Sequence, residues 1–213
     1  MIKEIYTLYA ERWHFFLDLT WEHLQISLTS ILIATIVGLG LGIMISMYRK
    51  SSSTVLGFTN FIYTIPSIAL FGFLIPFSGI GNTTAIIALS IYALLPMVHN
   101  TYTGIIGIDK EIIEAARGMG STTFQILYKI QIPLAFPVIL SGIRNMVVMT
   151  IALTGIAAFI GAGGLGVAIY RGITTNNSAM TIAGSLLIAL LALLADWGVG
   201  RSEKYIKRKR KLL

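Results

Sequence analysis

The sequence predicts an all-α protein, a polytopic membrane helical bundle of about five transmembrane helices. The 213 residues have a mean hydropathy of +0.81. Only 12% of them are charged, about half the share of roughly 25% that soluble domains carry. Several long stretches contain no Asp, Glu, Lys or Arg. Since roughly 20 apolar helical residues cross the hydrocarbon core of a bilayer, these stretches are long enough to span a membrane.

Residues 1–23 are predicted to form an extracytoplasmic segment at the membrane surface. Charged residues alternate here with aromatic ones, among them Trp13 and Trp21. Amphipathic rings favour the interface between lipid and water. A plain polar segment leading into the first span is an equally good interpretation. The segment lacks a compact apolar region followed by a small-residue cleavage site, so it is not predicted to be a signal peptide.

The transmembrane permease domain is predicted over residues 24–199. Gly38 and Gly42 in its first span are spaced to let another helix approach closely. The uncharged stretch Ser51–Ile108 is long enough for two spans, and Gly79-Ile80-Gly81-Asn82 is the predicted turn between them because glycine and asparagine favour turns. The five predicted spans are 24–48, 55–77, 83–106, 138–159 and 180–199.

The basic residues predict the orientation, because cytoplasmic segments of membrane proteins are enriched in Lys and Arg. With the N-terminus outside, the inner segments hold thirteen Lys and Arg residues and the outer segments hold three. The C-terminus and the loop 109–136 are therefore predicted to be cytoplasmic. Seven of the thirteen lie in a basic tail, residues 200–213. A basic run beside an apolar span is typical of a membrane anchor, so no nucleic-acid partner is predicted.

No catalytic, cofactor-binding or metal site is predicted. The chain has no cysteine, and His14, His23 and His99 lack the spacing of metal ligands. The run Gly161-Ala-Gly163-Gly-Leu-Gly166 fits the glycine pattern of dinucleotide-binding turns, but an apolar span precedes it where a strand is required. A flexible or tightly packed bend is the better interpretation. No Walker sequence occurs, so ATP is predicted to bind to another chain.

Some residues inside the spans are candidates for a solute pathway or gate. Proline breaks occur next to transport pathways, although a structural kink is the more frequent outcome. Asn100 and His99 are costly in lipid and are predicted to face the bundle interior, and for Asn100 a hydrogen bond between helices is as good an interpretation as a pore-lining role. The candidate pathway residues are Pro66, Asn100, Gly161, Gly163 and Gly164.

The loop 109–136 is predicted to begin with a short helix. Asp109 is a favourable N-cap residue. The helix is expected to run through residues 114–117 and to end at Gly118-Met119-Gly120. Its small alanines would let a partner approach closely.

A second short helix is predicted after this glycine turn. Ser121 is its expected cap. Phe124, Leu127 and Tyr128 would share one face, since they are spaced i, i+3, i+4, and the two prolines Pro133 and Pro137 would end the helix. The product is a helix–turn–helix elbow on the cytoplasmic side.

The order Glu114-Ala115-Ala116, three residues, Gly120, nine residues, Ile130-Gln131-Ile132-Pro133 resembles the EAA signature of ABC importer permeases. Isoleucine at 132 replaces the usual leucine. In that family the signature forms coupling helices that dock into a groove on the cytoplasmic ATPase. The resemblance implies a type I ABC importer permease fold. The coupling residues that it implies are Glu114, Ala115, Ala116, Gly120, Ile130, Ile132 and Pro133.

Three further stretches, Thr64–Leu70, Asn100–Gly104 and Ala157–Gly166, resemble the branch that imports osmoprotectants such as glycine betaine, carnitine and choline. His99 stands where that branch commonly has arginine. The resemblance implies a permease in the plasma membrane of a bacterium that moves a quaternary ammonium solute by alternating access. It also implies three kinds of partner: a cytoplasmic ATPase dimer that hydrolyses the ATP, a second permease copy or homologue, and an extracytoplasmic substrate-binding protein.

Two alternatives stay open from the residues alone. One is an ABC permease for another small solute, such as an amino acid. The other is a secondary transporter driven by an ion gradient, which would often keep charges at mid-membrane. Arg144 and Asp196 are both predicted near cytoplasmic ends of spans, which disfavours this second class.

Overall fold

The computed structural model describes residues 1–209, and Arg210 and Lys211 of the predicted basic tail lie outside that range. Within it the chain contains helices and turns but no strand. The elements are α1 (Ile2–Glu11), α2 (Trp13–Met47), α3 (Arg49–Thr64), α4 (Ser67–Ser78), α5 (Asn82–Ile106), α6 (Lys110–Gly118), α7 (Thr123–Ile126), the π-helix η1 (Leu127–Gln131), α8 (Ile132–Thr154), the 3-10 helix η2 (Gly155–Ile160), α9 (Gly166–Thr174) and α10 (Ser178–Lys209).

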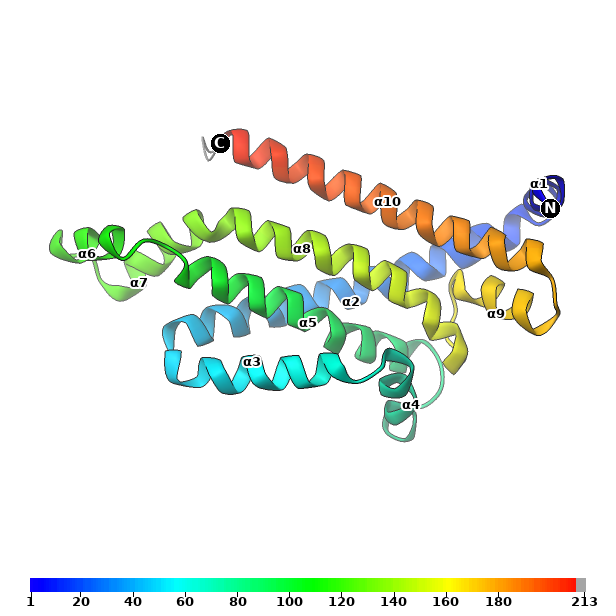
Figure 1. Ribbon diagram of the computed structural model, residues 1–213, viewed down its shortest axis with the longest axis horizontal. Coiled ribbons are helices and arrows are strands. Elements are labelled where there is room, and N and C mark those ends of the chain that lie inside the picture. The colour runs from blue at the N-terminus through cyan, green and yellow to red at the C-terminus, as the bar shows by residue number, and fades with distance from the viewer. Residues whose placement is uncertain (210–213) are drawn as a thin grey trace.

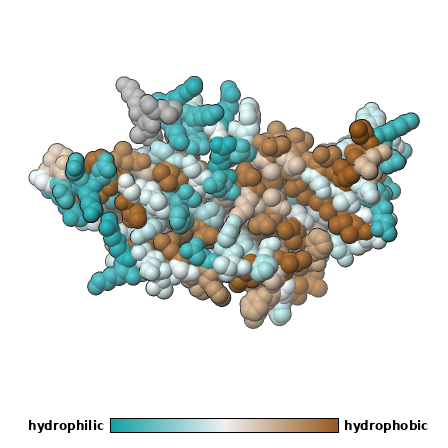
Figure 2. Space-filling model, viewed as in Figure 1, coloured by the Kyte–Doolittle hydropathy of each residue, from teal (hydrophilic) through white to brown (hydrophobic). Residues whose placement is uncertain are grey.

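Four long helices, α2, α5, α8 and α10, run along the long axis of the molecule (Figure 1). The short helices α6 and α7 lie at one end, together with the C-terminal end of α10, and α1 and α9 lie at the other end. The loop after α5 and the end of α10 thus share a side, as the basic residues predict. Figure 2 shows hydrophilic residues gathered around α6 and α7 and at the tip near α1, with apolar residues over much of the surface between them.

The long helices are apolar enough to cross a membrane. Four helical segments qualify by length and composition in the described range: α2, α5, the segment Thr123–Ile160, and α10. The predicted span 83–106 is confirmed by α5. The helix that contains the first predicted span starts at Trp13 and passes residues 23 and 24 without a break. The last span continues as helix into the basic tail.

The predicted span 55–77 is broken at Pro66, where a kink was the favoured interpretation. The chain forms α3 and α4 instead, which are bent by 100° relative to each other, so a fifth crossing exists only if this bent pair counts as one span. The cause is Pro66, which cannot continue a helix because it lacks an N–H and excludes helical geometry at the residue before it. Ile65 is extended (φ −70°, ψ 127°), and its carbonyl accepts a hydrogen bond from the Tyr92 hydroxyl.

Gly38 and Gly42 make the close helix contact that their spacing predicts. A Cβ on Gly38 would lie 2.7 Å from the Met97 side chain, and one on Gly42 would lie 2.5 Å from Cβ of Thr101. Both contacts join α2 to α5. Around them α2, α5 and α8 bury a common apolar cluster that includes Ala34 and Met97. This core fixes the orientation of α5, whose C-terminal end leads into the segment that carries α6 and α7.

An ion pair joins α8 to α10. Arg144 donates from Nε and Nη2 to the two carboxylate oxygens of Asp196, each at 2.6 Å. Each residue lies near the middle of its helix, because α8 and α10 extend beyond the predicted spans. Two opposite charges in one bidentate contact compensate each other, which makes them tolerable inside a membrane domain.

Candidate functional site

The turn after α6 is built around Gly120. The Gly120 N–H donates to the carbonyl of Arg117 at 2.9 Å, and the Ser121 N–H donates to the carbonyl of Ala116 at 3.0 Å. These two bonds form a Schellman motif, which requires a left-handed residue at the Gly120 position. Gly120 has φ +85°, a conformation that glycine adopts without steric cost. The predicted helix end and glycine turn are confirmed, although the Asp109 side chain makes no capping hydrogen bond.

The second short helix is capped by Thr122 rather than by Ser121, so that detail of the prediction is wrong. The Gln125 N–H donates to the Thr122 hydroxyl at 3.3 Å, and the Thr122 N–H donates to the Gln125 side chain at 2.8 Å. This reciprocal pair is a capping box, which satisfies two backbone donors at once. It fixes the direction in which the chain leaves the glycine turn.

The chain does not end its helix at the two prolines. Pro133 is the second residue of α8, and Pro137 lies inside the same helix. The π-helix η1 precedes them and changes the helical register. Leu127 is buried, whereas Phe124 and Tyr128 are exposed and stack on each other, so the prediction that all three share one face is wrong.

The predicted coupling residues separate into two groups. Glu114, Ala115 and Gly120 are exposed on α6 and its turn, whereas Ala116 is buried. The second group, Ile130, Ile132 and Pro133, is partly buried where η1 continues into α8. The first group is available to a partner, and the second connects the elbow to the bundle.

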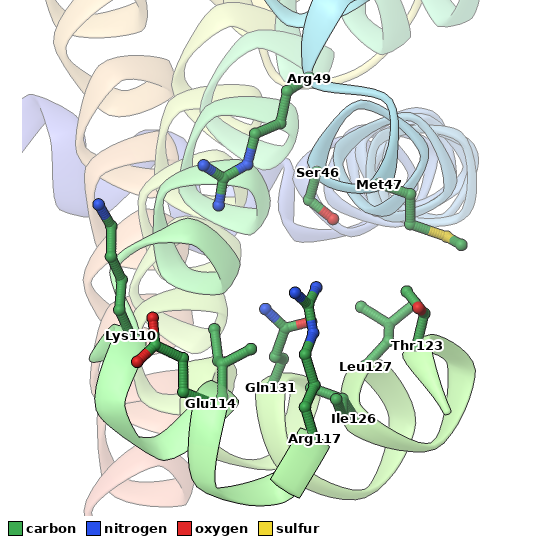
Figure 3. Close-up of a pocket in the computed structure, with 11 residues that line it drawn as sticks. Ser46, Met47, Arg49, Lys110, Glu114, Arg117, Thr123, Ile126, Leu127 and Gln131 are labelled. Carbon is green, nitrogen blue, oxygen red and sulfur yellow. The ribbon is translucent and has the colours of Figure 1, made fainter. Parts of the chain in front are cut away.

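A cavity of about 350 Å³ lies behind α6, between the elbow and the junction of α2 and α3. Figure 3 shows Arg49 and Arg117 directed toward each other across it, with Lys110 and Glu114 at its edge. Three cationic side chains thus border the cavity with one carboxylate. Within residues 1–209, Glu114 forms no ion pair shorter than 4 Å. Its charge is therefore available to a partner.

Three exposed apolar residues at the elbow were not predicted as site residues. Met119 is 80% exposed, Phe124 68% and Tyr128 66%. Large apolar side chains on a polar surface are characteristic of a protein contact. Their signal in the sequence is the position of Met119 within the glycine turn and of Phe124 directly after the polar run Ser121–Thr123.

Asn100 lines a second cavity, of about 560 Å³, which α3, α5, α8 and α10 border. Its side chain donates to the carbonyl of Pro96 at 2.7 Å, within its own helix, and its Cβ fits against Gly142 of α8. His99 also lines this cavity and is exposed, so the prediction that it faces the interior of this bundle is wrong. Pro66 lies apart, at the bend between α3 and α4.

The glycine run after η2 forms a tightly packed bend. Gly161 and Gly164 have positive φ values of 75° and 86°. The Gly163 N–H donates to the Asn82 side chain at 2.8 Å, and a Cβ on Gly163 would lie 1.9 Å from Cδ of Glu22. The five candidate pathway residues are therefore distributed over three places: the cavity, the α3–α4 bend and this glycine bend.

Comparison with known proteins shows what the chain is similar to. Residues 30–208 match the family model described as binding-protein-dependent transport system inner membrane component. The chain is 40% identical to OpuCD of Bacillus subtilis, a glycine betaine/carnitine/choline transport system permease protein, over 99% of this chain and 93% of that relative. It is 42% identical to the osmoprotectant import permease protein OsmW of Salmonella typhimurium, over 92% and 97% of the two chains.

Solved structures share the fold. The inward-facing methionine ABC transporter MetNI superposes with a TM-score of 0.83 at 24% identity, covering 90% of this chain and 95% of the other. An amino acid ABC transporter superposes with a TM-score of 0.76 at 18% identity, covering 94% and 96%. At these identities the likeness concerns the fold alone, and it agrees with the predicted type I importer permease fold.

Proposed function

The chain belongs to the family of binding-protein-dependent transport system inner membrane components, the permeases of ABC importers, and we propose that its solute is a quaternary ammonium osmoprotectant. The observation that carries this assignment is the 40–42% identity, over nearly the whole chain, to permeases named for glycine betaine, carnitine, choline or osmoprotectant import. The cavity that Asn100 lines, at the middle of the helices, supports a path for a small solute.

ATP is proposed to bind to a separate cytoplasmic ATPase dimer that contacts the elbow. The support is the absence of a Walker sequence from the chain, together with the exposed group formed by Glu114, Ala115, Gly120, Met119 and Phe124. A charged residue surrounded by small and apolar ones offers a partner both close approach and one directional contact. No cofactor is assigned to this chain.

A second permease, either a copy or a homologue, and an extracytoplasmic binding protein complete the proposed importer. Four qualifying helices and one bent pair form a small bundle, which is why the path is proposed to lie between two permeases. Residues 1–23 are proposed to lie outside, 24–199 to form the membrane domain, and 200–213 to lie in the cytoplasm. The thirteen-to-three distribution of basic residues supports this orientation in a bacterial plasma membrane.

The proposed mechanism is alternating access. ATP-driven closure of the ATPases would move α6 and α7, and the stem formed by Ile130, Ile132 and Pro133 would pass this movement to α8 because η1 and α8 are continuous. Since α8 packs on α5 and α10, the movement would reach the walls of the cavity. A helix bundle with two discrete packing arrangements converts a small local displacement into a switch of the cavity between access from outside and access from the cytoplasm.

The experiment is solute uptake in a bacterium that lacks this gene and other osmoprotectant carriers. At high osmolarity we expect restored uptake of at least one of glycine betaine, carnitine and choline when the gene is supplied with its ATPase and binding protein. A strain supplied with the ATPase and binding protein alone is the control. Restored uptake of an amino acid only, with none of these three, would contradict the proposed solute class.

A further inference from the structure

The cavity beside Asn100 presents polar side chains where a lone bundle would meet lipid. Asn60 on α3, His99 on α5 and Asn145 on α8 line it, and all three are exposed. The part of α5 that borders it, residues 95–100, begins roughly 20 Å along the helix from Asn82 and ends roughly 9 Å before Ile106, so it lies inside the helix. Polar side chains at this depth are costly in lipid, so this face borders a water-filled path or another protein surface.

An aromatic ring lies among these polar groups in a fixed orientation. Tyr63 lies in the last turn of α3, shortly before the bend, and its side chain lines the same cavity. Its ring packs edge-on against Tyr92, with centroids 5.9 Å apart, and its hydroxyl contacts Sδ of Met149 at 3.3 Å. Tyr63 is nevertheless 46% exposed, so these contacts hold the ring while leaving part of it open.

The charges around the cavity favour a cation. Among its lining residues there is no Lys or Arg, and the only fixed charge is the carboxylate of Asp196. That carboxylate bonds to Arg144, so it is the negative end of an ion pair rather than a free anion, and only this negative end lines the cavity. A solute with a positive end would therefore meet no fixed cation and an available aromatic face.

We propose that the ring of Tyr63 holds the quaternary ammonium group of the solute during its passage through this cavity. The inference rests on the proposed function, and it makes Tyr63 a residue that selects onium solutes. The electron-rich face of an aromatic ring attracts an onium cation, and more strongly where water is partly excluded. Amide groups of Asn60 and Asn145 would solvate the remaining polar part of the solute. Such a site is weak, as a transit site must be so that the solute leaves it.

The test uses the complete transporter, with its ATPase and binding protein, reconstituted in lipid vesicles. Uptake of radiolabelled choline, glycine betaine and carnitine is measured for wild type and for variants at Tyr63. Tyr63→Phe keeps the ring and loses the hydroxyl contact, whereas Tyr63→Leu removes the ring. A ring-trifluorinated phenylalanine at the same position keeps the shape of phenylalanine but withdraws the charge from its face. Phe61→Leu is the control, since Phe61 is an exposed aromatic residue of the same helix that does not line the cavity.

We expect Tyr63→Phe and Phe61→Leu to transport close to the wild-type rate. The fluorinated variant and Tyr63→Leu should lose about 3- to 30-fold in maximal uptake, the range that cation–π energies imply. ATP hydrolysis without solute should stay the same in all variants. Equal uptake by the phenylalanine and fluorinated variants would overturn the inference, even if Tyr63→Leu failed to fold. Wild type that carries none of the three solutes would overturn the proposed function, and this inference with it.

Discussion

The carboxylate of Glu22 on α2 accepts a hydrogen bond from the backbone N–H of Gly164, 3.1 Å away. Its other oxygen accepts from the Asn82 side chain at 3.0 Å, and Asn82 in turn accepts from the Gly163 N–H. One carboxylate thus joins α2, the start of α5 and the glycine bend before α9. This cluster holds the end of the bundle opposite the elbow, where the sequence suggested only a bend.

Replacing this carboxylate should loosen the glycine bend. In Glu22→Gln the amide can offer only one acceptor oxygen, so either Gly164 or Asn82 loses its partner. Hydrogen exchange of backbone amides in segment 161–166, measured by mass spectrometry, should become faster than in wild type. Asp18→Asn, one turn earlier on α2 and exposed, is the control and should leave the exchange unchanged. Unchanged exchange in Glu22→Gln would show that the hydrogen bond does not hold the bend.

The close contact between α2 and α5 predicts that alanine substitution has opposite effects on stability at two neighbouring glycines, Gly42 and Gly40. Gly42→Ala places a Cβ 2.5 Å from Cβ of Thr101, and overpacking of this kind costs about 1–3 kcal/mol. Gly40→Ala meets nothing within 4 Å and should be neutral or slightly stabilising, because alanine favours helix more than glycine does. Thermal unfolding in detergent compares the two, and equal unfolding temperatures would contradict the packing described for α2 and α5.

The topology is testable because the chain has no cysteine, so each introduced thiol is unique. Thr83 and Ser202 are both exposed and lie toward opposite ends of the bundle. With the N-terminus outside, Thr83→Cys should react with a membrane-impermeant maleimide in intact cells. Ser202→Cys should react only after the cells are opened. The reverse pattern would mean that the orientation inferred from the basic residues is wrong.

Hydropathy and spacing were sufficient to predict most of the fold. The uncharged stretches predict the long helices, the glycine spacing predicts the contact of Gly42 with α5, and the motif around Gly120 predicts the elbow. The ends of the helices were predicted less well. Hydropathy marks only the apolar part of a helix. Both α2 and α10 continue as helix into polar sequence, where backbone hydrogen bonds and packing determine at which residue the helix ends.

The remaining features depend on contacts between distant residues, which one sequence does not reveal. Arg144 and Asp196 are far apart in the chain, and only the packing of α8 on α10 brings them together. The role of Tyr63 depends on the packing of α3 beside α5 and α8, which brings Tyr63, His99 and Asn145 to one cavity. The π-helix that begins at Leu127 likewise has no clear local signal.

Gly120 is expected to act through its backbone conformation. A Cβ there would meet nothing within 4 Å, but φ is +85°, which asparagine tolerates and β-branched residues do not. Gly120→Asn should therefore retain most of the transport activity, whereas Gly120→Val should lose most of it while the helices stay inserted in the membrane. Uptake in vesicles measures transport, and circular dichroism of the reconstituted protein measures whether the helices are retained. Equal transport by the two variants would exclude a requirement for the left-handed turn.

The central claim is that the exposed elbow couples a separate ATPase to solute import, and Glu114 tests it most directly. The decisive measurement is ATP hydrolysis stimulated by solute-loaded binding protein, in vesicles that contain Glu114→Lys and the ATPase. Glu11→Lys, the same charge reversal at the exposed end near α1, is the matched control. We predict that Glu114→Lys loses the stimulation, and co-purifies with less ATPase, while Glu11→Lys still stimulates hydrolysis. Full stimulation by Glu114→Lys, with the ATPase still bound, would contradict this account of the elbow.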